Sequence, residues 1–239
     1  MQITQRQSPN RNRGRQGWTP DIIVCHITEG AFDGAVSWLT NPDSQVSSHF
    51  VVARDGRVTQ LVALEDTAWA NGTTTGTDSR GNRHSRLAAV RDRNVNANLY
   101  TISIEHEGRH SETRGALTPA QLQATTDLIA HIRTEVKRIF NFDIPINRSH
   151  IVGHADITPQ WKPNCPGQEY PFNEIISRLT VAEPPKENTH EPSDWAKEAW
   201  QWAMDNKLTD GTNPQGVPTR EQMMQLLFNY HRFSNASIS

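Results

Sequence analysis

The chain has 239 residues, a formal net charge of −2 and a pI near 6.5. This length accommodates one substantial domain and a small additional module, but not three ordinary domains. The near-neutral charge argues against a nucleic-acid-binding protein, which would carry a basic patch or a basic domain. No window of the sequence approaches a transmembrane span, which argues against membrane insertion. Residues 1–16 lack an apolar stretch of signal-peptide length, so we expect a chain made in the cytoplasm without a signal peptide.

The first elements of the chain predict a buried strand followed by a short helix. A basic run, formed by Arg11, Arg13 and Arg15, precedes them and is expected to be solvated. Residues 21–27 form a continuous, mostly β-branched run, which is typical of a strand buried on both faces. A short helix is expected over residues 31–39.

The next elements predict a hairpin, a long excursion and a further strand. Apolar runs at 49–53 and 57–61 flank an Asp-Gly pair, and both residues of such a turn tolerate positive φ. Residues 71–98 are polar and contain glycine, which indicates a surface excursion able to face a substrate. Residues 99–105 alternate apolar and polar side chains, so two isoleucines lie on one face of the strand and Glu105 lies on the other.

A long amphipathic helix completes the pattern of the main domain. A capping box with a first-turn proline at 118–121 opens this helix, and apolar residues then recur at helical spacing. Strands punctuated by helices in this order predict an α/β domain with a central mixed β-sheet flanked by helices. We assign this domain to residues 1–180.

The remaining sequence predicts a linker and a small helical module. Residues 181–192 hold three prolines and several charges, which is a linker composition. The module, residues 193–239, contains two capped helical patterns, and its Trp195, Trp200 and Trp202 are expected to be packing residues. Because two short helices bury little surface alone, the module is expected to dock on the main domain, pair with another copy or bind a partner.

One proline-rich segment, residues 153–167, carries the residues that favour metal chemistry. It contains His154, Lys162 and Cys165. Zinc prefers imidazole and thiolate donors, and a catalytic zinc typically takes three protein ligands and leaves a fourth position for water. His154 and Cys165 supply two ligands, and a histidine at the end of an apolar strand is the expected third. The other cysteine, Cys25, is interpreted as a small buried hydrophobic residue.

Five ordered segments resemble motifs of one enzyme family. They are "IVIHxT", "SxHYxVxxDG", "AWHAG", "NxxSIGIE" and "GHxDxxPxxKxxCPG", matched here at residues 23–28, 47–56, 68–72, 98–105 and 153–167. These motifs are typical of the type-2 zinc N-acetylmuramoyl-L-alanine amidases, which include peptidoglycan-recognition proteins and phage endolysins. A single motif would be weak, whereas five in order make chance resemblance improbable. Ala70 departs from the pattern, because the family commonly has histidine there.

The resemblance implies a zinc ion (Zn²⁺) in an open cleft, with His26, His154 and Cys165 as its ligands. It also implies that Glu105 accepts a proton from water and passes it to the leaving nitrogen, and that Lys162 stabilises the oxyanion. The bond cleaved would join the lactyl group of N-acetylmuramate to L-alanine of the stem peptide.

Four further residues are expected near the substrate: His49, Trp69, Asn71 and Trp161. His49 is equally consistent with a packing role. Trp69 and Trp161 are expected either to line a groove for sugar and peptide or to be core aromatic residues.

The C-terminal residues 193–232 resemble a single S-layer-homology repeat. This resemblance implies attachment to the cell wall or self-association, and hence a possible homodimer.

Three functions are compatible with these features. The first is a bacteriolytic amidase that degrades bacterial peptidoglycan as an endolysin or autolysin, acting on the wall after release by phage or cell lysis. The second is a non-catalytic peptidoglycan-binding protein, which Cys165 disfavours because that class typically lacks the cysteine ligand. The third is a zinc peptidase that cuts within the stem peptide, and the ligands alone leave it open.

Overall fold

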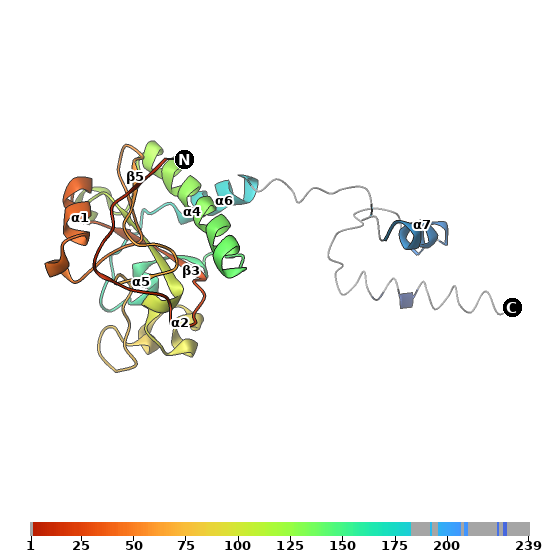
Figure 1. Ribbon diagram of the computed structural model, residues 1–239, viewed down its shortest axis with the longest axis horizontal. Coiled ribbons are helices and arrows are strands. Elements are labelled where there is room, and N and C mark those ends of the chain that lie inside the picture. The colour runs from red at the N-terminus through yellow and green to blue at the C-terminus, as the bar shows by residue number, and fades with distance from the viewer. Residues whose placement is uncertain are drawn as a thin grey trace. The chain divides into compact units, whose positions relative to one another are not determined.

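The computed structural model describes residues 2–182, 192, 196–206, 208–209, 224 and 227–228. The chain divides into two compact units, Met1–Ala182 and Glu183–Ser239. The first unit contains a sheet with helices on both sides (Figure 1). Among the described residues, no helix combines the length and the apolar composition that crossing a membrane requires.

The centre of the first unit is a six-stranded mixed sheet. Its strands lie in the order β1 (Ile3–Gln5), β5 (Val58–Gln60), β4 (Phe50–Val52), β7 (Thr101–His106), β3 (Ile22–Ile27) and β8 (Ile151–Gly153). Strands β4 and β5 are antiparallel, whereas the other neighbouring strands are parallel. A separate antiparallel pair joins β2 (Arg11–Asn12) to β6 (Thr67–Ala68). The predicted mixed sheet is therefore confirmed.

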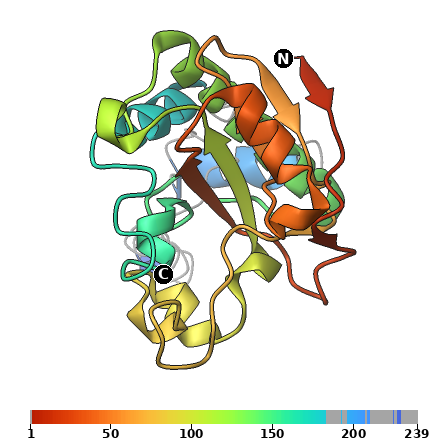
Figure 2. The same cartoon turned by 90° about the vertical axis from the view of Figure 1, so that its left-hand side faces the viewer.

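Helices cover the two faces of this sheet differently (Figure 2). On one face, α4 (Pro119–Phe140) and α6 (Phe172–Ala182) form the main hydrophobic core with the strands. On the other face, α1 (Phe32–Leu39) packs near β4, while α2 (Ala88–Arg93) packs near β3. Short helices α3 (His110–Thr113) and α5 (His154–Ile157) complete the unit, together with 3₁₀ turns at Pro42–Ser44, Asn82–His84 and Ala97–Tyr100.

Side chains alternate along β3 and β7, so core residues and site residues lie on opposite faces of the sheet. Ile23 and Ile104 join the core that α4 covers. Because successive residues of a strand point to opposite faces, His26 and Glu105 lie on the other face. They are register partners on adjacent parallel strands, so the sheet itself places them side by side.

Two local predictions need refinement. The hairpin between β4 and β5 forms, but Gly56 has φ of +90° and Asp55 is not among the residues with positive φ. The excursion 71–98 is not simply a surface loop, because it contains α2, whose Val90 is fully buried. The long helix is confirmed, and its cap Thr118 accepts a hydrogen bond from the backbone N–H of Gln121.

The described part of the second unit contains α7 (Lys197–Asp205), which lies within the predicted helical module and carries Trp200 and Trp202. Most of the linker, Trp195 and most of the second helix expected after residue 219 lie outside the described residues, although residues 224 and 227–228 of that helix are described and are helical.

Candidate metal centre

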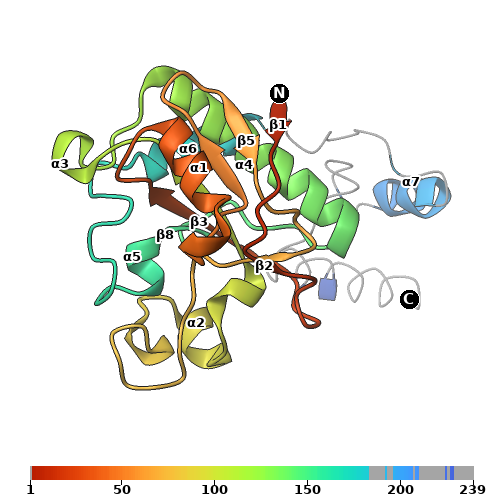
Figure 3. The ribbon, with the colours of Figure 1, turned by 60° about the vertical axis from the view of Figure 1, so that its left-hand side comes forward.

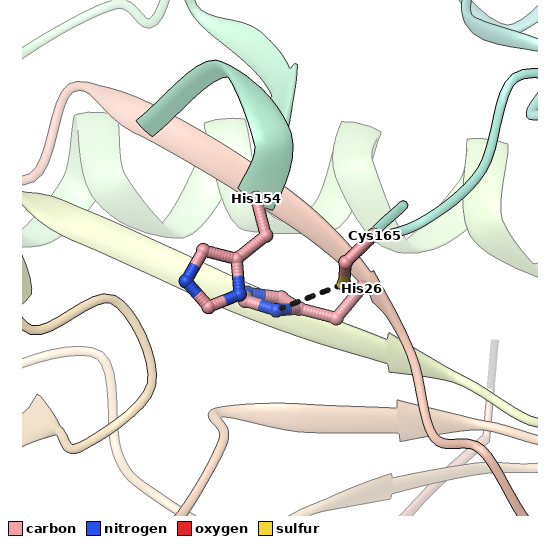
Figure 4. A group of neighbouring side chains, drawn as sticks. All are labelled: His26, His154 and Cys165. Atoms are coloured by element: carbon pink, nitrogen blue, oxygen red, sulfur yellow. Dashed lines mark hydrogen bonds between the residues drawn. The ribbon is translucent and has the colours of Figure 1, made fainter. Parts of the chain in front are cut away.

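Three side chains that could hold a metal ion meet where β3 and β8 end. His26 lies near the end of β3, and His154 begins α5 directly after the neighbouring strand β8. Figure 3 shows β3, β8 and α5 in the same part of the unit. Cys165 follows in the next loop, where its carbonyl accepts a hydrogen bond of 2.8 Å from the N–H of Ala155. The three side chains converge although they come from separate elements (Figure 4).

The distances in this cluster suit a tetrahedral metal site. The three ligand atoms lie within 4.8 Å of one another, and Cys165 Sγ lies 3.8 Å from His26 Nδ1. The imidazole rings meet nearly edge to face, with centroids 4.5 Å apart and an interplanar angle of 68°. Tetrahedral zinc ligands at ordinary bond lengths lie about 3.5 Å apart, so small side-chain movements would complete coordination.

The protonation states also fit a divalent cation. Burial lowers the pKa of His26 well below its usual value, and burial together with the charge of Lys162 lowers the pKa of His154 to about 3. Both imidazoles are therefore neutral at pH 7, as metal ligands must be. Burial and the nearby Glu105 raise the pKa of the Cys165 thiol. A cation held by the cluster would supply the opposite charge that a buried thiolate requires.

A glycine lets the cysteine loop approach the sheet. A Cβ atom on Gly153 would lie 2.7 Å from Cδ of Pro166 and 3.3 Å from the carbonyl oxygen of Cys165. The missing side chain at the end of β8 therefore makes room for the loop that carries Cys165.

Glu105 lies at the edge of the same cluster. Its Oε1 lies 3.9 Å from His26 Nδ1, and its Oε2 is buried without a hydrogen-bond partner among the described residues. Burial raises the pKa of Glu105 to about 7, with the charge of Glu29 adding to this rise and that of Lys162 opposing it. A carboxyl group with this pKa can both accept and release a proton near neutral pH.

A cavity of about 870 Å³ opens over the cluster. Lys162, Trp69 and Trp161 line it together with the three metal-binding residues and Glu105. The backbone N–H of Lys162 donates to the carbonyl of Thr158 at 2.9 Å, which anchors the start of the loop.

The structure does not bring His49 and Asn71 to the cavity wall. Both side chains are only 1% exposed, and neither lines the cavity. His49 Nε2 lies 2.9 Å from the guanidinium of Arg15, and its Nδ1 lies 3.1 Å from Oγ of Ser103. These contacts agree with the packing alternative for His49.

Trp38 and Arg80 also line the cavity, although the sequence patterns did not indicate them. Trp38 is 55% exposed on α1, whose buried stripe is formed by Phe32, Val36 and Leu39. A large aromatic residue off the apolar stripe of a helix was the signal available in the sequence. Arg80 lies 5.5 Å from the ring centroid of Trp161, so this residue pair forms another part of the wall.

Comparison with known proteins identifies the family. The family model for N-acetylmuramoyl-L-alanine amidase matches residues 16–168, which include His26, His154 and Cys165. The chain belongs to the N-acetylmuramoyl-L-alanine amidase family. As an amidase of this family, it is a hydrolase of peptidoglycan.

Individual relatives agree with this membership. The amidase is similar to N-acetylmuramoyl-L-alanine amidase A of Achromobacter lyticus, with 32% identity over 167 residues, covering 66% of this chain and 81% of the relative. It is also similar to 1,6-anhydro-N-acetylmuramyl-L-alanine amidase AmpD of Haemophilus influenzae, with 29% identity over 135 residues, covering 56% of this chain and 59% of the relative.

Solved structures support the fold. A crystal structure of a selenomethionine derivative of AmpD superposes with a TM-score of 0.52 and 22% identity, covering 74% of the amidase and 93% of that chain. A structure of PlyL gives a TM-score of 0.50 and 18% identity, covering 75% of the amidase and 97% of that chain. At these identities the similarity shows the type-2 amidase fold alone.

Proposed function

We propose that the amidase cleaves the bond between the lactyl group of N-acetylmuramate and L-alanine of the stem peptide, with zinc held by His26, His154 and Cys165. The observation that carries this proposal is the convergence of these donors with Glu105 on one cavity wall. Two neutral imidazoles and one thiolate form a catalytic zinc set, since three protein ligands leave one position open.

Glu105 and Lys162 carry out the remaining chemical steps. A bound zinc ion supplies Lewis-acid chemistry, making a water molecule more acidic and polarising the substrate carbonyl. Glu105 takes the proton of the attacking water on Oε2, which has no hydrogen-bond partner in the described residues, and delivers it to the leaving nitrogen of L-alanine. Lys162 lines the same cavity and stabilises the developing negative oxygen through its positive charge.

Incubation with purified cell wall tests this function. We expect new L-alanine amino termini and intact glycan strands by mass spectrometry, with release abolished by a chelator and restored by added zinc. A second arm uses soluble 1,6-anhydro-muropeptides, because one relative is named for that substrate. New termini inside the stem peptide would instead support a zinc peptidase, and wall binding without any release would support a non-catalytic binding protein.

The boundaries and the role of the C-terminal part are proposals from sequence. We propose a catalytic domain at 1–180, a linker at 181–192 and a module at 193–239 that attaches an endolysin or autolysin to the wall. Co-sedimentation of the full chain with insoluble wall, compared with a chain that ends at residue 182, measures attachment. Analytical ultracentrifugation of the full chain tests the alternative of a homodimer.

Trp38→Ala is expected to raise KM for cell wall about 2- to 10-fold with little change in kcat, because aromatic stacking contributes about 0.5–1.5 kcal/mol. Trp38 is exposed on the cavity wall, so truncation removes a surface for binding and leaves the ligands intact. Steady-state kinetics on solubilised peptidoglycan measure the effect. Ser37→Ala is the control, since Ser37 is exposed on α1 but does not line the cavity. Equal KM values for both variants would contradict a binding role.

A further inference from the structure

The two nitrogens of His26 have different surroundings. Nδ1 faces the other site groups, at 3.8 Å from Cys165 Sγ and 3.9 Å from Glu105 Oε1. Nε2 is buried, and no partner lies at ordinary hydrogen-bond distance in the part of the chain that the structure describes. A neutral histidine binds a metal through one nitrogen, and the group that accepts the N–H of the other nitrogen decides which one is free.

A buried asparagine lies beside this ring with its orientation fixed. The Thr101 hydroxyl donates to the carbonyl of Ala97 at 2.7 Å, so its hydrogen is committed and its oxygen can only accept. Asn71 Nδ2 donates to that oxygen at 2.9 Å. This contact assigns the two ends of the amide, because the opposite orientation would place two acceptors together. The backbone N–H of Asn71 also donates to Oδ1 of Asn98 at 2.6 Å, which holds the residue in place.

The remaining end of this amide matches the unpartnered nitrogen of His26. Within the described part of the chain, Asn71 Oδ1 is buried and has no partner at ordinary hydrogen-bond distance, as is true of His26 Nε2. The Asn71 side chain lies within hydrogen-bonding reach of the His26 ring. An acceptor and a donor that are both buried and unpaired each cost free energy, and a small side-chain shift that joins them removes both costs.

We infer that Asn71 is a positioning residue that accepts the Nε2–H of His26 and thereby presents the Nδ1 lone pair to the metal. The inference rests on the proposed zinc site. It adds that Asn71 selects the tautomer of His26, the proposed zinc ligand on β3. It also replaces the substrate contact expected for Asn71, since a side chain that is 1% exposed does not reach the cavity.

The first test is zinc affinity, measured by competition with a chelator of known affinity. Asn71→Leu is expected to weaken zinc binding about 10- to 100-fold, the usual effect of losing a partner behind a metal ligand. Asn82→Leu is the matched control. Asn82 is also 1% exposed, and its Nδ2 donates to Val95 O at 2.8 Å. Its Oδ1 is likewise buried without a hydrogen-bond partner among the residues that the structure describes. Its amide contacts Val90 and Val95 rather than the metal cluster, so its zinc affinity should stay within about twofold of wild type.

The second test is the tautomer of His26 in the metal-free protein, read from ¹⁵N–¹H correlations of the imidazole rings. Wild type and Asn82→Leu should show the Nε2–H form, whereas Asn71→Leu should shift towards the Nδ1–H form. Thr101→Val serves if Asn71→Leu does not fold, because loss of the acceptor frees the amide to turn its NH₂ towards His26. That turn should also favour the Nδ1–H form and weaken zinc binding.

Two results would overturn the inference: an Nδ1–H tautomer in the wild type, or zinc affinities of Asn71→Leu and Thr101→Val equal to that of Asn82→Leu. Neither readout depends on peptidoglycan cleavage. A wild-type protein that binds zinc through the Nε2–H tautomer but cleaves no wall would therefore refute the proposed function and retain the role of Asn71.

Discussion

Glu105→Gln is expected to lower kcat by about 10²- to 10⁴-fold while the protein still binds one zinc ion per chain, because the glutamine keeps the shape of the side chain but cannot carry a proton. Oε1 of Glu105 lies 3.9 Å from His26 Nδ1, and its Oε2 is buried with no hydrogen-bond partner among the described residues, so this oxygen is available to accept a proton. The release of new amino termini from solubilised peptidoglycan measures kcat, and metal analysis of the same sample measures zinc content.

Glu29→Gln is the control for this substitution. Glu29 lines the same cavity, but its carboxylate accepts a hydrogen bond from the backbone N–H of His110, an interaction that glutamine can retain. We expect its kcat to remain within about threefold of wild type, because the charge of Glu29 is a smaller influence on the pKa of Glu105 than burial or Lys162. Retention of more than a tenth of wild-type kcat by Glu105→Gln would assign the proton transfer to another group.

Local sequence patterns predict the strand residues of the site well. The period-2 alternation of 99–105 predicted that Glu105 faces away from the isoleucines, and the paired strands β3 and β7 confirm this arrangement. The position of His26 follows from the same rule, because a strand of fixed pleat determines which face each side chain meets. These residues were predictable because backbone geometry alone decides their direction.

Residues whose positions the sequence patterns did not predict are placed by contacts with residues far away in the sequence. Arg15 was expected in a solvated basic run, but it is 4% exposed. Its guanidinium donates to the carbonyls of Leu64 and Thr101 and lies beside His49. The partners are 34 to 86 residues away in sequence, so no local pattern contains this information. Arg15 is therefore a buried residue that bridges the backbone of Leu64 and Thr101 and contacts His49.

The loop that carries Cys165 shows an intermediate case. The motif at 153–167 predicted which residues could bind a metal, namely His154 and Cys165. Whether they meet His26 depends on how the loop packs on the sheet. That packing requires the space at Gly153, and the structure shows the requirement through the close approach of Pro166. A glycine in a motif indicates that something approaches closely, but the sequence does not say what.

Cys165→Ser is expected to remove tight zinc binding, to reduce wall hydrolysis by more than about 100-fold, and to abolish stabilisation of the fold by zinc. A serine hydroxyl stays protonated near pH 7 and lacks the soft sulfur donor, so the remaining imidazoles of His26 and His154 form an incomplete set. Zinc at 100 times its dissociation constant should stabilise the wild type by about 2.7 kcal/mol, which appears as an increase in Tm.

Cys25→Ala is the control that distinguishes loss of metal binding from loss of a core packing contact. Cys25 precedes His26 in β3, but it is fully buried in the core on the opposite face, where α4 packs. Its loss should lower Tm with and without zinc by similar amounts and leave the zinc-dependent increase in place, because a core contact is independent of the ligand equilibrium. For Cys165→Ser the same comparison should show a Tm that zinc no longer changes. A zinc-dependent increase that persists in Cys165→Ser would mean that the metal is held by other residues, and it would remove the thiolate from the proposed centre.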